Sequence, residues 1–166
     1  MQKEINPAQK LVVFSESKET TTHIVKHLKA KGRNDVLEIH SDNRDKLKQT
    51  IRENFDANIP TIQYKNDFNI IIATEVLAEG VNLHRSNVIV NYDTPWNSTR
   101  LMQRIGRVNR IGSVAPKVYI FNFYPTAKVN SDIELEKKNM IHFTNDYKNN
   151  CCIKINRDAS YKDTRT

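Results

Sequence analysis

The sequence predicts an α/β fold with three layers, in which helices flank a mainly parallel sheet of five or six strands. Short apolar runs rich in β-branched residues alternate along the chain with segments of helical periodicity. The run at residues 69–73 (NIIIA) is apolar after its first residue, which is typical of a strand buried on both faces. Strands that alternate with helices are joined by crossover connections and therefore run parallel.

Strands are expected at residues 11–15, 36–39, 69–73, 87–92 and 117–123. The first expected helix is capped by Ser17 and ends near Gly32. Further helices are expected at residues 42–55, 98–105 and 132–148, the last begun by a capping box of Ser131 and Glu134. Residues 58–67 are polar, contain Pro60 and are expected to form a surface loop. The domain is expected to cover residues 10–148, between a polar segment at 1–9 and a flexible polar tail at 149–166.

The composition indicates one globular domain with an anionic partner. A chain of 166 residues with 38% hydrophobic residues fits a single core. The formal net charge of +7 favours nucleic acid or a nucleotide, although a piece cut from a larger protein could also carry it. No apolar run approaches the roughly 20 residues that span a bilayer, and residues 1–10 are too polar for a signal peptide. The only cysteines, Cys151 and Cys152, are adjacent, which favours a reducing, cytoplasmic location and no metal site.

The most informative segment is residues 103–110 (QRIGRVNR), where Arg107 and Arg110 follow Gly106. Arginine presents a planar fork of donors that matches phosphate oxygens, and a glycine beside it permits close approach. Residues 94–131 contain no Asp or Glu, but they contain Arg100, Arg104, Arg107, Arg110, Lys117 and Lys128. Such a window predicts contact with an external polyanion. Taken singly, Arg107 and Arg110 would be interpreted as a solvated helix face.

Polar side chains follow the expected strands at their carboxyl ends, where ligands bind in parallel sheets. The candidates for contact with a nucleic-acid backbone are Ser15, His40, Ser41, Thr74 and Glu75. Residues 40–42 could instead cap the next helix, and residues 74–80 could form one helical turn that ends at Gly80. Asp93, after the fourth strand, could cap a helix or hold an arginine of the basic window.

Two common phosphate-binding motifs are missing from the sequence. Neither GxxxxGK[ST] nor GxGxxG occurs anywhere. If the domain acts on a nucleotide, it therefore does so as a partner and does not supply the main pocket.

Taken in chain order, the segments LVVFSES, ATEVLAEGVNL, NYDTPWN and QRIGRVNRIG resemble the second RecA-like domain of superfamily 2 helicases and translocases. They match motif IV, motif V and motif VI of that family, and the likeness covers residues 10–125. The stretch YDTPWNSTRLMQRIGRVNRIGS is particularly similar to Swi/Snf-related and RapA-type ATPases. The resemblance implies a RecA-like domain.

The resemblance also implies roles for single residues. Arg110 would be the arginine finger that reaches the γ-phosphate of ATP, and Arg107 would also face the phosphates. Gly80, Asn82, Gln103 and Gly106 would lie on the ATP side, with Asn82 where many relatives have an Asp that faces the ribose. Thr74 would contact the nucleic-acid backbone.

In that family ATP and Mg²⁺ are bound mainly by the first RecA-like domain, whose motifs this sequence lacks. The chain is therefore expected to be the C-terminal motor domain of a helicase or duplex translocase, inactive alone and partnered by the N-terminal RecA-like domain. The similarity favours DNA over RNA, and no membrane partner is expected, because no apolar run is long enough to span a bilayer. The alternatives are a non-catalytic nucleic-acid-binding or interaction module of the same fold, and a doubly wound enzyme that binds a phosphorylated metabolite.

Overall fold

The structure is a computed structural model that describes residues 10–78, 80–95, 97–115, 117–123 and 151–156. Its elements follow one another in the order β1 (Lys10–Phe14), α1 (Lys18–Ala30), β2 (Val36–Ile39), α2 (Arg44–Phe55), η1 (Thr61–Gln63), β3 (Ile70–Ala73), η2 (Glu75–Ala78), β4 (Ser86–Asn91), α3 (Ser98–Val108), β5 (Val118–Phe123) and β6 (Cys151–Asn156). The two η elements are short 3₁₀ helices.

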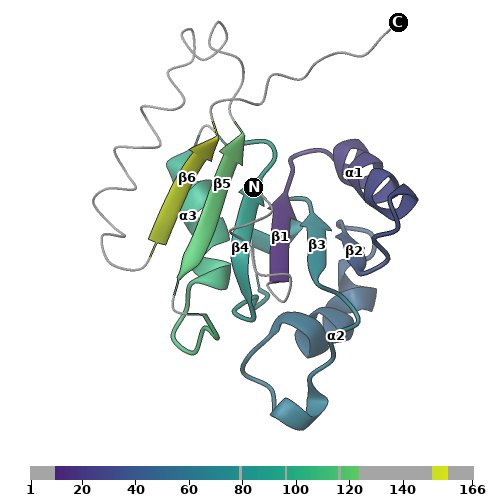
Figure 1. The fold of residues 1–166 in the computed structure, drawn as a ribbon, viewed down its shortest axis with the longest axis vertical. Coiled ribbons are helices and arrows are strands. Elements are labelled where there is room, and N and C mark those ends of the chain that lie inside the picture. Colours follow the sequence, from purple (N-terminus) through teal and green to yellow (C-terminus); the bar gives the residue numbers. More distant parts are fainter. Residues whose placement is uncertain (1–9, 79, 96, 116, 124–150, 157–166) are drawn as a thin grey trace, which may run out of the picture.

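The strands form one sheet in the order β2-β3-β1-β4-β5-β6 (Figure 1). Every neighbouring pair in that sheet is parallel. This arrangement confirms the predicted α/β class and the predicted strand direction. β1 lies in the middle of the sheet and contributes side chains to the cores on both faces, which explains its apolar run at residues 11–14.

Helices cover both faces of the sheet and make it the middle of three layers. On β1, Val12 and Phe14 belong to the larger core, which includes residues of α2 and α3. Val13, between them, belongs to a smaller core with Val25 of α1. The alternation along one strand therefore separates the α2 and α3 layer from the α1 layer.

The parallel sheet has two distinct edges, which we call the carboxyl edge and the amino edge. Figure 1 shows the arrowheads of the strands at the top, which is the carboxyl edge. The helix α3 begins after β4 and returns toward the amino edge, where the loop to β5 lies at the lower end of the sheet. Residues that follow strands thus lie at one edge, whereas residues 109–115 lie at the other.

The predicted elements agree closely with those observed. All five expected strands are present and shifted by at most one residue at either end. Ser17 caps α1 as expected, with its side chain accepting from Thr20 N. The helix α2 begins at Arg44, with Asn43 in the N-cap position in place of Ser41 or Asp42. Residues 58–67 are a loop, as predicted, and contain the short η1 helix.

The strand β6 is an element that the sequence did not predict. The stretch 149–166 was expected to be a tail without regular structure, yet residues 151–156 pair with β5 in parallel. Pairing with an open sheet edge can impose strand structure on a segment whose own pattern is too short to predict it. The expected helix at 132–148 and the segment 1–9 lie outside the described residues.

Candidate functional site

Arg110 lies just beyond the end of α3 and is oriented by neutral oxygen atoms. Its Nε donates to the carbonyl oxygen of Gly106 at 3.0 Å, and its Nη1 donates to Asn82 Oδ1. Its backbone N–H donates to Ser113 Oγ at 3.0 Å, which fixes the turn after the helix. No carboxylate in the described part of the chain pairs with this exposed guanidinium. Its charge is therefore held in place without being neutralised.

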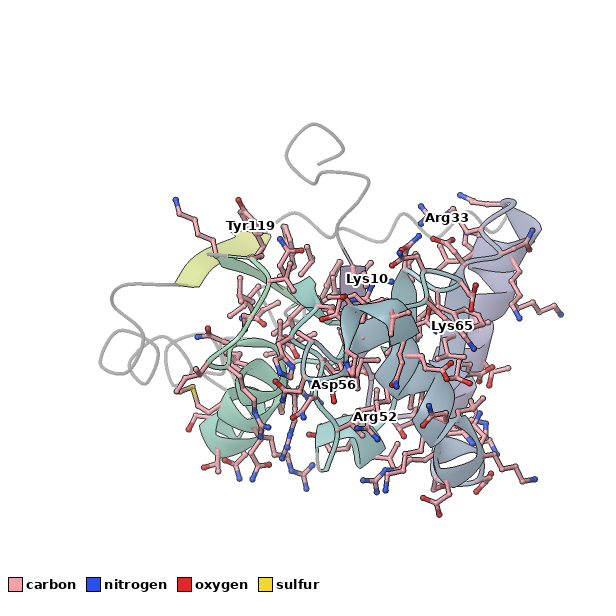
Figure 2. The ribbon with its side chains drawn as sticks, turned by 90° about the horizontal axis from the view of Figure 1, so that it is seen from below. Lys10, Arg33, Arg52, Asp56, Lys65 and Tyr119 are labelled. Atoms are coloured by element: carbon pink, nitrogen blue, oxygen red, sulfur yellow. The ribbon has the colours of Figure 1, made fainter. Side chains whose placement is uncertain are left out.

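Asn82 in turn contacts a buried carboxylate. Its Nδ2 donates to Asp56 Oδ2 at 3.4 Å, and Asp56, which ends α2, is only 8% exposed. Asp56 Oδ1 also accepts from the backbone N–H of Asn58 at 2.8 Å. Figure 2 views the molecule from the amino edge and labels Asp56 near its middle. Arg110, Asn82 and Asp56 thus form a chain of polar contacts at this edge.

His84 lies beneath that chain and is fully buried. Its Nε2 is 3.8 Å from Asp56 Oδ1, which exceeds hydrogen-bond distance. Burial lowers the pKa of His84 below its usual value, the positive charge of Arg110 lowers it further, and Asp56 opposes both effects. The lowered pKa favours the neutral imidazole, and the Asp56 carboxylate makes its hydrogen bonds to Asn82 and Asn58.

The predicted phosphate-facing segments come together at the amino edge. The carbonyl oxygen of Arg107 accepts the backbone N–H of Leu83 at 2.9 Å, which joins the chain after η2 to the last turn of α3. Asn82, Gly106 and Arg110 meet there through the two side-chain hydrogen bonds of Arg110. Gln103 is exposed on α3, one helical turn before Arg107.

Gly80 lies in a different setting, beside the first turn of α2. Its φ of 72° is in the left-handed region that favours glycine. A pocket of about 200 Å³ lies there and is lined by Arg44, Asp45, Lys48, Ile51, Gly80 and Val81. This placement agrees with the alternative interpretation of Gly80 as the end of a helical turn.

Arg104 differs from its two neighbours, because its side chain is fully buried. Its Nε and Nη2 donate to the carboxylate of Glu75, and its Nη1 donates to Asn91 Oδ1 at 2.9 Å. The guanidinium also lies 5.1 Å from the centre of the Phe14 ring. The prediction that Arg104 belongs to a patch of cations without acidic partners is therefore wrong. Its partner comes from a different segment, the start of η2.

At the carboxyl edge, two of the predicted nucleic-acid contacts have side chains that are engaged within the fold. Ser15 is fully buried, and its Oγ donates to Asp93 Oδ2 at 2.5 Å. The carboxylate of Glu75 is bound by Arg104. Of the two alternatives for Asp93, a helix cap or a partner for an arginine, the structure shows the second. The carbonyl oxygen of Asp93 accepts from Arg104 Nη1 at 3.2 Å. The cap of α3 is Asn97.

The other three predicted contacts adjoin one another at this edge, although the His40 ring is mostly enclosed, with its Nε2 3.3 Å from Asn43 Nδ2. Thr74 is partly exposed, and its backbone N–H donates to the carbonyl oxygen of Ile39 at 3.2 Å. This bond places Thr74 directly beside His40 and Ser41, which follow Ile39 in the chain. Ser41 is exposed, whereas the His40 side chain is only 16% exposed. Three polar residues from two neighbouring strands therefore adjoin one another at the carboxyl edge.

Neither a metal site nor a membrane span is found in the part of the chain that the structure describes. No group of three or more His, Cys, Asp or Glu side chains there could hold a metal ion. No described helix is long and apolar enough to cross a membrane.

Asp56 and His84 are the site residues that reasoning from the sequence missed. Asp56 ends a helix and His84 precedes a strand, and neither belongs to a segment with a functional pattern. They approach each other only because α2 ends at the edge where β4 begins. No sequence signal indicates that contact.

Comparison with known proteins agrees with this fold and arrangement. Residues 1–112 match the helicase conserved C-terminal domain. The chain is 46% identical over 59 residues to the uncharacterized ATP-dependent helicase YqhH of Bacillus subtilis, covering 36% of this chain and 10% of that protein. It is 32% identical over 120 residues to the ATP-dependent RNA helicase eIF4A of Saccharomyces cerevisiae, covering 70% of this chain and 28% of that protein.

The ATP-dependent RNA helicase DBP2 of Candida glabrata is 30% identical over 113 residues, covering 68% of this chain and 19% of that protein. The chain therefore spans less than a third of the length of these relatives.

Solved structures share the fold. The C-terminal part of the Fun30 ATPase domain superposes with a TM-score of 0.59 at 18% identity, covering 76% of this chain and 38% of that chain. S. cerevisiae Dbp5 bound to RNA and ADP BeF3 superposes with a TM-score of 0.58 at 22% identity, covering 89% of this chain and 35% of that chain. With a match that extends over residues 1–112 and a sheet of parallel strands between helices, this chain belongs to the helicase conserved C-terminal domain family.

Proposed function

We propose that this chain is the C-terminal motor domain of an ATP-dependent nucleic-acid helicase or translocase, and that Arg110 is its arginine finger. The observation that carries the proposal is the environment of Arg110. Its guanidinium is exposed at the amino edge and is held by the neutral oxygens of Asn82 and Gly106. A neutral acceptor orients the side chain and leaves its positive charge for the phosphates of ATP.

Arg107 would contact the same phosphates, with Gln103, Gly106 and Asn82 around them. ATP and its Mg²⁺ would be bound mainly by a first RecA-like domain, so that the fingers arrive when the two domains close. Hydrolysis would then depend on closure.

Nucleic acid would bind at the opposite edge, over Thr74, His40 and Ser41. Hydroxyl groups and backbone N–H groups at strand ends suit phosphate contacts that do not depend on sequence. If the nucleic acid extends onto the first domain as well, its binding and ATP binding favour the same closed state and so strengthen each other.

The resemblance in sequence and the names of the relatives point to different kinds of nucleic acid. The similarity of residues 92–113 to Swi/Snf-related ATPases favours DNA, whereas DBP2 and eIF4A are RNA helicases by name. The preference for DNA has no support in these comparisons. We therefore propose a nucleic-acid partner without a preference for either kind.

The proposal is tested by replacing Arg110 in the full-length protein. We expect Arg110→Ala to lower the rate of ATP hydrolysis by about 10³-fold or more, because a positioned arginine stabilises the charge of the transferring phosphoryl group. ATP binding, measured by fluorescence of a labelled nucleotide, should change little. Arg100→Ala, on the exposed face of the same helix, is the matched control and should retain the wild-type rate.

An equal loss of binding and hydrolysis would show that Arg110 is structural, and an unchanged rate would contradict its role as a finger. The 166-residue chain alone should show no ATP turnover. A full-length protein without ATPase activity that still binds nucleic acid would favour the alternative of a non-catalytic module.

A further inference from the structure

The amide of Asn82 makes two contacts of opposite polarity. Its Nδ2 donates to Asp56 Oδ2 at 3.4 Å, and its Oδ1 accepts from Arg110 Nη1. An amide rotated by 180° would place an NH₂ group against the guanidinium, where donor would face donor. The orientation of Asn82 therefore decides whether it can hold Arg110.

Asp56 is suited to impose that orientation, because a carboxylate only accepts hydrogen bonds. It is 8% exposed and is fixed by the N–H of Asn58 at 2.8 Å. Its own backbone N–H donates to the carbonyl oxygen of Arg52 at 3.1 Å, which anchors it to the end of α2. His84 Nε2 lies 3.8 Å from Asp56 Oδ1, beyond hydrogen-bond distance, and so does not compete with Asn82 for the carboxylate.

We propose that Asp56 is a positioning residue for the arginine finger and that it acts through Asn82. The inference rests on the proposed function, since it assigns Asp56 a task in presenting Arg110 to the nucleotide. Asp56 does not touch the nucleotide. It sets which atom of Asn82 faces Arg110, and thereby places the Nη1 group of the guanidinium.

The competing interpretation is that Asp56 only stabilises the turn at residues 56–58. The two interpretations predict different consequences for Asp56→Asn. This side chain keeps an oxygen that can accept from Asn58 N–H, so the turn is retained. It also carries an NH₂ group, so it no longer forces Asn82 to turn its oxygen toward Arg110.

The test uses single-turnover ATP hydrolysis by the full-length protein at saturating ATP. We expect Asp56→Asn and Asn82→Ala each to lower the rate about tenfold or more, since small displacements of a catalytic group have effects of this size. The unfolding midpoint and the ATP affinity of Asp56→Asn should stay at the wild-type values. Asp67→Asn removes the same charge from an exposed loop position and should leave the rate unchanged.

The double variant Asp56→Asn with Asn82→Ala separates positioning from fold stability. If Asp56 acts through Asn82, the double variant has the same rate as Asn82→Ala alone, because the path from Asp56 to Arg110 is already broken. Losses that multiply would overturn the inference. So would a wild-type rate for Asn82→Ala, even if Asp56→Asn failed to fold.

Arg110→Ala in the same assay distinguishes a failure of the proposed function from a failure of the role of Asp56 alone. If Arg110→Ala does not change the rate, the proposed function itself fails. If Arg110→Ala abolishes hydrolysis while Asp56→Asn hydrolyses ATP at the wild-type rate, only the role of Asp56 fails.

Discussion

Two arginines in the motif at residues 103–110 look alike in the sequence and have different surroundings in the structure. Arg110 is exposed and held by neutral oxygens, whereas Arg104 is buried against Glu75 and Asn91. The spacing along α3 accounts for the difference. Arg104 lies on the same helix face as the buried Leu101, Ile105 and Val108, at intervals of three and four residues. Periodicity alone could therefore have identified it as inward-facing.

This assignment predicts that Arg104 stabilises the fold. We expect Arg104→Ala to lower the free energy of unfolding by about 2–3 kcal/mol, because it removes a fully buried side chain and its hydrogen bonds to Glu75 and Asn91. Arg100→Ala, on the exposed face of α3, should change it by less than about 0.5 kcal/mol. Urea denaturation of the 166-residue chain, followed by circular dichroism, measures both. Similar midpoints for the two variants would contradict the burial of Arg104.

At the scale of elements, two glycines from the predicted ATP site occupy different backbone conformations. Gly80 follows η2 with a φ of 72°, and an added Cβ would lie 2.9 Å from Arg44 Nη2. Gly106 lies within α3, where an added Cβ would meet nothing within 4 Å. Only the first position depends on the freedom of glycine to adopt a positive φ.

Alanine at these positions should therefore have opposite effects on stability. Gly80→Ala should destabilise the chain by about 1 kcal/mol or more, because of the left-handed conformation. Gly106→Ala should stabilise it by about 0.5–1 kcal/mol, since alanine is favoured over glycine inside a helix. Thermal unfolding of both variants gives the comparison. Destabilisation by Gly106→Ala would show that another group of the folded chain packs against Gly106.

The elements could be predicted from the sequence where their patterns are local. The strands β1 to β5 are short, apolar and β-branched, and each was placed within one residue. The strand β6 depends on pairing with β5 and has no long pattern of its own. The contact between Asp56 and Asn82 joins residues from separate elements. No local sequence pattern predicts this contact.

At the scale of the whole molecule, the candidate contacts divide between the two edges of the sheet. The rule that ligands lie beyond the carboxyl ends of parallel strands correctly locates Thr74, His40 and Ser41 at the carboxyl edge. It does not apply to Arg110, because α3 runs back toward the amino edge before the motif ends. In the proposed function the two edges serve different ligands. A single chain with a net charge of +7 can then bind phosphates at both.

This division predicts that nucleic-acid binding and ATP hydrolysis can be impaired separately. In the full-length protein, Thr74→Ala should weaken nucleic-acid binding by about threefold to tenfold, as expected for the loss of one hydrogen bond. It should leave the ATPase rate without nucleic acid unchanged. Thr61→Ala, which replaces an exposed threonine of η1, is the matched control.

Binding should be measured by fluorescence anisotropy with single-stranded RNA and with duplex DNA over a range of salt concentrations, since the salt dependence reports the number of phosphate contacts. The nucleic acid that gives the larger stimulation of the ATPase is the one on which the motor acts. If Thr74→Ala binds both ligands as tightly as the wild type, the carboxyl edge is not the nucleic-acid site.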